Sequence, residues 1–440
     1  MYRQLSEMTM KLSGKKVYAE NMIWLFADKM VRIFGGLVIG VWVARYLGPE
    51  NYGIFNYAIA FSAFFSFLSD LGLNAIVVRE LTKKNINYGY LMGTAFGLKL
   101  FGALIMIFVC SIAAFSIKRN EPVVMWGIIV YSLSYLFHAF DVIDYNFQSN
   151  VLSKYTVIAR NLSFVITSLI KIVFIILHFS VICFITASII EIAISGLTSV
   201  LIYSRINENK EKWKIDRKLS KVLLKNSWPL MLSMFLITIY VKIDQVMIDA
   251  FLDITKVGIY SVAVRLCTSW YFVPALITTT FMPYFIKLKE TNINLFNKRL
   301  MQIQSAIIWL GITVGIGTMI FGKIIIIKMF GYEYIEAYTA LSLNIWAGIF
   351  VSLGYISNFW VISGNLQIYR MVGAIISVSI NVIGNYLLIP KFGITGAAMS
   401  TLGTQIIATW FAPLIFKEIR GYIIMSIKAL CPVYLLGIKK

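Results

Sequence analysis

Apolar residues in this chain gather in long runs that are separated by short polar segments. Residues 101–115 and 307–321 contain no charged side chain, and neither run alternates between polar and apolar positions. A helix that crosses a bilayer needs about 20 mostly apolar residues, whereas barrel strands need about 10 with period-two alternation. Only helices and closed barrels satisfy their backbone hydrogen bonds in lipid. The pattern therefore predicts an all-α integral membrane protein.

Twelve runs are long enough to be transmembrane helices, which we number in chain order. They are residues 22–44, 54–78, 89–116, 122–146, 161–177, 179–203, 226–250, 257–285, 302–322, 336–362, 371–390 and 393–416. A further apolar stretch, 421–438, is short and is interrupted by Lys428 and Pro432, which favours an interfacial segment over a thirteenth span.

Composition and charge distribution fit this interpretation. The 440 residues are 59% hydrophobic and 14% charged, whereas a soluble chain carries about 25% charged residues. The net charge of +20 would suggest nucleic acid binding in a soluble protein. Here 27 of the 40 Lys and Arg residues fall on the two termini and one set of alternating loops, and 7 fall on the opposite loops. This bias predicts that both termini are cytoplasmic (N-in, C-in), and it argues against a nucleic acid partner.

A weak internal repeat predicts two lobes. The sequence YGIFNYA at 52–58 is matched by VGIYSVA at 257–263, 205 residues later. Six spans in each half give both halves the same orientation, so the repeat would be parallel, with a pseudo-twofold axis along the membrane normal. We expect an N-terminal lobe at 1–203, a basic cytoplasmic linker at 204–225, a C-terminal lobe at 226–416 and a cytoplasmic or interfacial tail at 417–440. Chance similarity between apolar helices is the alternative.

Charged residues inside the spans are the candidate functional residues, because a charge in lipid is costly and usually faces a bundle interior or a wet cavity. Span 1 carries Asp28, Lys29 and Arg32, and span 7, its repeat equivalent, carries Lys242, Asp244 and Asp249. Other spans contribute further charges: Lys99, Asp141, Asp144, Lys171, Glu191, Arg265 and, just before span 11, Arg370.

Two interpretations of these charges stay open. The cations could line a cleft between the lobes and bind an anionic group such as a phosphate or an acidic sugar, and the carboxylates could pair with them or couple an ion. Alternatively, the charges could form internal ion pairs or reach to the interface. The four cysteines and two histidines lack ligand spacing, so we expect no disulfide, metal or cofactor. No HExxH, GxSxG or Walker motif is present, which argues against an enzyme.

Several ordered motifs resemble those of a known family. They read ARYLGPENYG at 44–53, DLGLN at 70–74, VRE at 78–80, WPL at 228–230, KIDQVM at 242–247, GIYS at 258–261, NVIGNYLLIP at 381–390 and GITGAAMST at 393–401. Each motif is weak alone, but their order and spacing over most of the chain resemble the bacterial O-antigen and capsule repeat-unit flippases. That polysaccharide transporter family belongs to the multidrug/oligosaccharidyl-lipid/polysaccharide exporter superfamily.

The resemblance implies a fold and a function. It implies twelve helices in two six-helix lobes around a cationic cleft in the bacterial inner membrane. The implied substrate is an undecaprenyl-diphosphate-linked oligosaccharide, which moves from the cytoplasmic to the outer leaflet by alternating access of the lobes. A polysaccharide polymerase and a chain-length regulator are the implied protein partners. Within matched motifs it points to Arg45, Asp70, Lys242 and Asp244, whereas Arg32, Arg265 and Arg370 depend on the charge argument.

Three alternatives remain. A multidrug exporter of the same superfamily would share the helix count, but it should have an acidic site for cationic drugs. A lipid II flippase normally has two more spans than this length accommodates. A membrane polysaccharide polymerase or ligase would need a large external loop, and every expected outside loop here is short.

Overall fold

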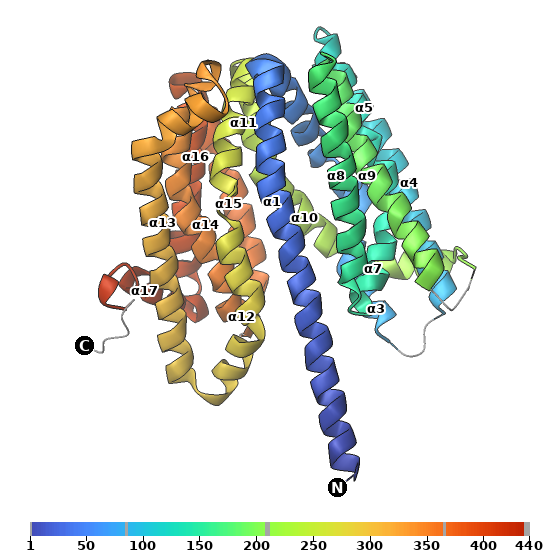
Figure 1. Cartoon of the computed structure of the whole chain (residues 1–440). Helices are drawn as coiled ribbons and strands as arrows, with labels where there is room; N and C mark the ends of the chain where they lie inside the picture. The colour runs from blue at the N-terminus through green and yellow to red at the C-terminus, as the bar shows by residue number, and fades with distance from the viewer. Residues whose placement is uncertain (1, 84–86, 207–211, 364–366, 435–440) are drawn as a thin grey trace. The chain divides into compact units, whose positions relative to one another are not determined.

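The computed structural model describes residues 2–83, 87–206, 212–363 and 367–434 (Figure 1). Side chains are described for these residues except 2–22, 279, 283, 362–363 and 367–371. Within this part of the chain every regular element is a helix and there is no strand. Eleven of the described helical stretches are long and apolar enough to cross a membrane. The chain is therefore an all-α multi-pass membrane protein.

The difference between eleven such stretches and twelve expected spans arises at the start of the chain. Helix α1 (Tyr2–Phe64) includes both the first expected span and the beginning of the second. Gly48 interrupts it with φ 69° and ψ 172°, and Pro49 begins the helix that follows. Glycine adopts this backbone conformation without a Cβ clash, and proline is favoured at a helix start. The second expected span then continues through two short helices, α2 (Ser66–Asp70) and α3 (Leu73–Leu81).

The described chain divides into two compact units. The first consists of Met1–Val43 and Tyr57–Phe235, and the second of Ala44–Asn56 and Leu236–Lys440. The division thus falls inside helix α10 (Arg217–Phe251), whereas the sequence placed it in the linker at 204–225. The short segment around the Gly48 turn belongs with the second unit.

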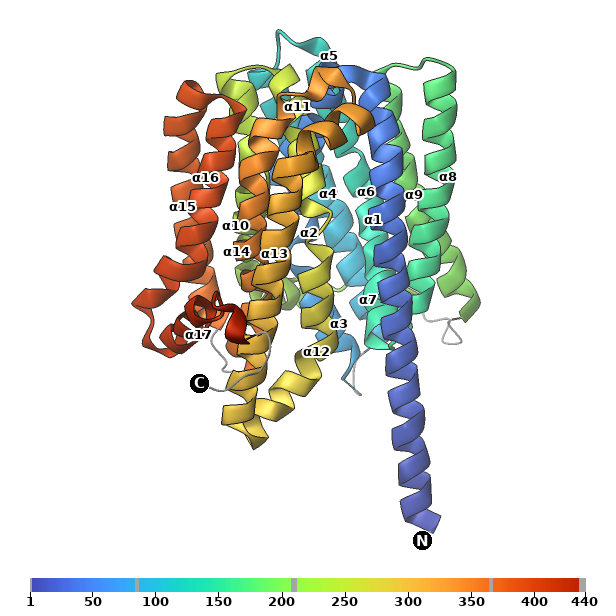
Figure 2. The same cartoon turned by 60° about the vertical axis from the view of Figure 1, so that its left-hand side comes forward.

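The first unit is a bundle whose helices vary widely in length. After α1 to α3 it contains α4 (Tyr88–Ile117), α5 (Pro122–Ser132), α6 (Ser134–Phe137), η1 (His138–Phe140), α7 (Asp141–Ser149), α8 (Ser153–Ile176) and α9 (Val181–Ile206). Helices α8 and α9 run side by side in both views (Figures 1 and 2). Buried side chains from α3, α4 and α7, among them Leu73, Met92 and Val142, form an apolar cluster. The cluster lies at the end of the unit that the sequence predicts to be cytoplasmic.

The second unit contains the remaining helices. They are α11 (Ile254–Thr268), α12 (Phe272–Thr291), α13 (Ile293–Met329), η2 (Tyr332–Tyr334), α14 (Ala337–Ser363), α15 (Gln367–Phe392), α16 (Ile394–Ile406), η3 (Ile407–Phe411), η4 (Ala412–Ile415), α17 (Lys417–Lys428) and η5 (Pro432–Tyr434). The short helix α17 packs across α13 and α14 (Figure 2), with Ile419, Tyr422 and Ile423 buried against Phe285 and Phe359. Only 12 residues long, α17 does not qualify as a span.

The internal repeat is visible as a reciprocal contact within the second unit. A Cβ atom on Gly53 would collide with the carbonyl oxygen of Ile254, and one on Gly258 would collide with the carbonyl oxygen of Pro49. Each residue of one pair lies 205 positions from its counterpart in the other, so Gly53 corresponds to Gly258 and Pro49 to Ile254. Such an exchanged contact is what a local twofold relation between the two repeat segments produces.

Candidate functional site

The charges of α1 join a network inside the first unit. Arg32 lies with its Nε 3.6 Å from the carboxylate of Asp28, one turn away, and with an Nη 3.6 Å from Glu191 of α9. Asp28 is buried, whereas the Arg32 side chain is 38% exposed. Glu191 also pairs with Lys171 of α8 at 3.4 Å and accepts a hydrogen bond from the Thr167 hydroxyl at 3.3 Å. Lys29 is half-buried beside this network.

A second ionic cluster surrounds Lys99, which is fully buried in α4. Its Nζ lies 3.3 Å from Asp70 and 3.4 Å from Asp141, and it donates to the Tyr145 hydroxyl at 3.0 Å. Asp141 Oδ2 also lies 3.0 Å from His138 Nδ1, within hydrogen-bond distance. Asp70 ends α2, just before Leu71 and Gly72 turn the chain in the left-handed region, and Asp141 begins α7. Lys99 therefore links the ends of two interrupted spans.

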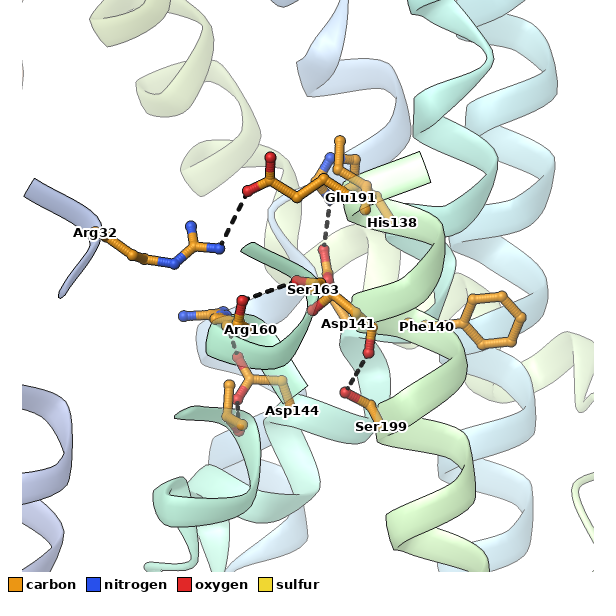
Figure 3. Close-up of a pocket in the computed structure, with 13 residues that line it drawn as sticks. Arg32, His138, Phe140, Asp141, Asp144, Arg160, Ser163, Glu191 and Ser199 are labelled. Atoms are coloured by element: carbon orange, nitrogen blue, oxygen red, sulfur yellow. Dashed lines mark hydrogen bonds and ion pairs between the residues drawn. The ribbon is translucent and has the colours of Figure 1, made fainter. Parts of the chain in front are cut away.

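These groups border a polar pocket of about 280 Å³ in the first unit (Figure 3). The pocket is lined by Arg32, His138, Phe140, Asp141, Asp144, Thr156, Arg160, Ser163, Glu191, Ile192, Ser195, Gly196 and Ser199. Figure 3 shows that Arg32 enters from α1, while Arg160 and Asp144 come from α8 and α7. Arg160 pairs with Asp144 at 3.1 Å, and Asp144 accepts further hydrogen bonds from Thr156 and Gln148.

Sequence reasoning did not select Arg160 or His138 for this pocket. The expected spans leave Arg160 in the loop between residues 146 and 161, but α8 begins at Ser153 and carries Arg160 about two turns into the bundle. His138 is one of the two histidines without metal-ligand spacing, but Asp141 follows it by three residues on the chain. That spacing is a signal that could have been used, because residues three apart on a helix lie on the same side. No sequence signal links Asp144 to Arg160, 16 positions apart.

The second unit holds a buried carboxylate, Asp244 of α10, which is 8% exposed. It accepts hydrogen bonds of 2.7 Å from the Tyr260 hydroxyl, the Asn385 amide and the Thr401 hydroxyl. The Asn385 amide also reaches Asn381 Oδ1 at 3.3 Å, and the buried Asn385 Oδ1 has no hydrogen-bond partner in the described part of the chain. A buried carboxylate that accepts from two hydroxyls and one amide N–H, and has no cation partner among the described residues, is a group that can take up a proton or a hard cation.

The partners of Asp244 come from three further helices. Tyr260 lies on α11, Asn385 on α15 and Thr401 on α16. None of the three is among the candidate residues of the sequence, because those candidates are charged and these three are neutral. Their common feature is that all three lie within the motifs GIYS, NVIGNYLLIP and GITGAAMST. Polar residues that recur inside otherwise apolar motifs were the available signal.

The remaining candidates are distributed over the second unit. Lys242 is half-buried on α10 and forms no hydrogen bond or ion pair with a described residue, and Asp249 lies two turns further along the same helix. Arg265 of α11 donates to the Tyr52 hydroxyl at 3.3 Å, and the exposed Arg45 donates to the Lys328 carbonyl oxygen at 3.5 Å. The side chain of Arg370 lies outside the described residues.

The candidates thus belong to separate groups within each unit. In the first unit the structure brings Asp28 together with Arg32, and Asp70 with Lys99. In the second unit Asp244 lies in its own hydrogen-bond network, apart from the partners found for Arg45 and Arg265. Among the described residues there is no group of three His, Cys, Asp or Glu side chains arranged to hold a metal ion.

Solved structures of transporters share this fold. The chain aligns with lipid II flippase MurJ in its inward closed conformation with a TM-score of 0.71 and 16% identity, over 96% of this chain and 94% of that one. An inward-facing multidrug resistance MATE family transporter of the MOP superfamily aligns with a TM-score of 0.65 and 15% identity, over 93% and 98%. A MOP superfamily transporter from Pyrococcus furiosus, described as having a binding pocket of reversed polarity, aligns with a TM-score of 0.60 and 15% identity, over 96% and 95%.

These identities show a common fold with two lobes, and nothing about the substrate. A search of curated proteins found no match. The sequence profile of one family, described as polysaccharide biosynthesis protein, matches residues 18–289, which is more than half of the chain and includes both the charged pocket and Asp244. This multi-pass membrane protein, with the fold of transporters and flippases, therefore belongs to the polysaccharide biosynthesis protein family.

Proposed function

We propose that this protein is a flippase for undecaprenyl-diphosphate-linked oligosaccharide repeat units. It would move them from the cytoplasmic to the outer leaflet of the bacterial plasma membrane for the synthesis of a surface polysaccharide such as O-antigen or capsule. The observation that carries the proposal is a polar pocket containing two arginines inside an apolar helical unit, in a chain of the polysaccharide biosynthesis family. A lipid-linked glycan needs such a polar path, because its phosphates and sugars cannot cross lipid unaided.

The cations supply the chemistry for the diphosphate. Arginine presents a planar fork of donors that matches phosphate oxygens, and its charge is retained at any physiological pH. Arg32 is the prime candidate, because its partly exposed guanidinium lies at the pocket wall. Lys29, Arg45, Lys242, Arg265 and Arg370 are further proposed contacts along the substrate's path.

Asp244 is the proposed coupling group. Its carboxylate is buried among hydroxyl and amide groups and has no cation partner among the described residues, so binding a proton or a monovalent cation would neutralise it. Ion binding at such a site changes the charge of one lobe, which is a means of driving alternating access. Asp28, Asp70 and Asp249 are proposed as ion-pairing groups. A polymerase and a chain-length regulator are the proposed partners that act on the flipped product.

Two other transport functions have specific support. The similarity to lipid II flippase MurJ favours a lipid-linked peptidoglycan precursor, whose diphosphate the same cations would accept. The similarity to multidrug resistance transporters favours cationic drugs, which would need the carboxylates rather than the arginines. The mixed charge of the pocket and the family match rank both behind the repeat-unit flippase.

Complementation tests the proposal. A strain that lacks its own repeat-unit flippase receives this gene, alone and together with the glycan gene cluster native to it, and surface polymer is scored. Restored polymer in either strain supports glycan flipping. Failure in both strains, with normal amounts of protein in the membrane, contradicts the proposal and points to drug export, which an efflux assay then measures.

Variants examine the cations in the same assay. Arg32→Ala and Lys242→Ala should abolish polymer at the surface while the protein remains in the membrane. Lys391→Ala, an exposed residue at the end of α15, is the matched control and should leave polymer unchanged. Wild-type polymer from both Arg32→Ala and Lys242→Ala would remove these two residues from the substrate path.

A further inference from the structure

An apolar groove between α1 and α8 lies about one turn further along both helices than the polar pocket of the first unit. The groove is lined by Phe34, Gly35, Val38 and Ile39 of α1 and by Phe164, Val165, Ser168 and Leu169 of α8. Gly35 and Ile39 lie three and seven positions after Arg32, and Phe164 lies four after Arg160, so polar and apolar walls share one face of each helix. The pocket and the groove therefore follow each other along the same two helices.

The absence of a side chain at Gly35 helps to shape the apolar groove. A Cβ atom at Gly35 would lie 2.7 Å from the Phe164 ring, so only glycine lets α1 approach the ring this closely. Val38, Val165 and Leu169 are each at least half exposed along the groove. A chain of isoprene units would cover them and bury apolar surface that the protein alone leaves open.

The two arginines of the pocket have N–H donors that are not used in hydrogen bonds with the described residues. Arg32 makes its two ion pairs at 3.6 Å, beyond hydrogen-bond length, and its buried Nε has no hydrogen-bond partner among the described residues. The Arg160 side chain is 41% exposed, and its one hydrogen bond among the described residues goes to Asp144. A guanidinium offers five N–H donors, so both groups could bind phosphate oxygens.

Two of the three carboxylates that pair with these arginines have other donors as well. Glu191 keeps Lys171 at 3.4 Å and Thr167 at 3.3 Å, and Asp144 keeps Thr156 at 2.5 Å and Gln148 at 2.9 Å. When Arg32 and Arg160 turn toward an incoming phosphate, Glu191 and Asp144 therefore each retain a donor of their own. Asp28 is buried and its one ion pair among the described residues is to Arg32, so Arg32 has to keep this contact through Nε while its Nη groups bind the phosphate. This matters because a buried carboxylate without a partner would cost more than the phosphate contact gains.

We propose that the pocket and the groove form one binding site for a polyprenyl phosphate, with the phosphate on Arg32 and Arg160 and the prenyl chain in the α1–α8 groove. Carboxylate and hydroxyl groups on the remaining walls then face the first sugar. The carboxylates can accept hydrogen bonds from the sugar hydroxyls, and the protein hydroxyls can both donate and accept. The site lies wholly within the first unit. It rests on the proposed function for the identity of the lipid, but it adds Arg160 and the groove as determinants of binding.

Lipid titration of the purified full-length protein, followed by native mass spectrometry, tests the site. The probes are undecaprenyl phosphate, undecaprenol, which lacks the phosphate, and phosphatidylglycerol. Arg160→Gln should weaken undecaprenyl phosphate binding about tenfold or more and leave undecaprenol unchanged. Val165→Trp, which fills the groove, should weaken both prenyl lipids. Neither variant should change phosphatidylglycerol binding.

Matched controls lie on the same helix. Lys154→Gln removes a cation of α8 outside the pocket, and Val173→Trp adds a large ring at a similarly exposed position outside the groove; both should bind all three lipids as wild type does. Thermal unfolding checks that each variant is folded, and Arg160→Lys, which keeps the charge, should bind more tightly than Arg160→Gln.

The outcomes separate the site from the function. Wild-type binding by Arg160→Gln and Val165→Trp overturns the site, as does an equal loss for phosphatidylglycerol, which would mark a general lipid contact. If wild-type protein binds undecaprenyl phosphate here but never restores surface polymer, the proposed flippase function fails and the site stands. If wild-type protein restores polymer and both variants do so equally well, the function stands and the site fails.

Discussion

At the scale of single residues, the charges of the first unit are paired both along one helix and between helices that are distant in the chain. The pair Asp28 and Arg32 follows from their spacing of four on one helix. The contact between Arg32 and Glu191 joins positions 159 apart, and no local pattern encodes it. Long-range partners depend on how helices are arranged, which hydrophobic periodicity does not specify. The candidate residues could therefore be predicted as a set, while their grouping could not.

Lys99 provides a test of a buried ionic cluster. Lys99→Met removes the lysine that lies between Asp70 and Asp141 and leaves two like charges facing each other. Both carboxylates are more than a third exposed, so water offsets part of the loss, and we expect a cost of about 1–3 kcal/mol. The apparent Tm of the purified protein measures it. The triple variant Lys99→Met, Asp70→Asn, Asp141→Asn should recover most of the loss, and a wild-type Tm for Lys99→Met alone would contradict the role of the cluster.

Asp244 tests coupling at one carboxylate. Asp244→Asn keeps an oxygen that can accept from Tyr260 and Thr401 but has no charge to bind a proton or a cation. We expect normal amounts of folded protein and a loss of transport of at least tenfold, measured in vesicles with an imposed proton or sodium gradient. Asp253→Asn, an exposed N-cap of α11, is the control and should transport normally. Gradient-driven transport at the wild-type rate by Asp244→Asn would show that coupling occurs elsewhere.

At the scale of elements, run length predicted where the spans are but not where they break. The expected spans 54–78 and 122–146 are each interrupted, the first at Phe65 and at Leu71 with Gly72, the second at Leu133 and His138–Phe140. Leu71 adopts φ 51°, a conformation that a leucine in an apolar run gives no reason to expect. The break is compensated by tertiary contacts such as Lys99 with Asp70, and those are invisible in a hydropathy pattern.

The reciprocal glycine contact is testable as an element-level feature. Gly53→Ala and Gly258→Ala each place a Cβ against a backbone carbonyl, which cannot move as a flexible side chain can. We expect each substitution to lower the apparent Tm clearly, with a cost of about 1–3 kcal/mol from forced backbone shifts. Gly36→Ala, on α1 with no atom within 4 Å of its added Cβ, should be neutral or stabilising. Equal melting of Gly53→Ala and Gly36→Ala would show that the close contact does not form.

At the scale of the whole molecule, the sequence predicted the class of protein and the two lobes, because composition, run length and an internal repeat all report on global architecture. The residues at which one lobe ends and the other begins are harder to predict from the sequence. The division falls within α10, and residues 44–56 group with the second unit, because the repeat segments pack on each other across 205 positions. Which side of the membrane each loop faces stays a prediction from charge, since helices in a bundle fit together equally well in either orientation.

Cysteine labelling in intact cells tests that orientation. Native Cys110, Cys183, Cys267 and Cys431 are first replaced by Ala or Ser, and single cysteines are then introduced at exposed loop positions. A membrane-impermeant maleimide should label Glu50→Cys, Asn120→Cys and Ser180→Cys without lysis. It should label Thr82→Cys, Lys218→Cys and Asn294→Cys only after lysis. Glu50→Cys, Thr82→Cys and Asn120→Cys alternate in side only if the chain turns back after Gly48 and crosses again through α2 and α3, which makes twelve crossings from eleven apolar stretches. Labelling of Glu50→Cys and Thr82→Cys from the same side would mean that this kinked segment does not cross, and the termini would then lie on opposite sides.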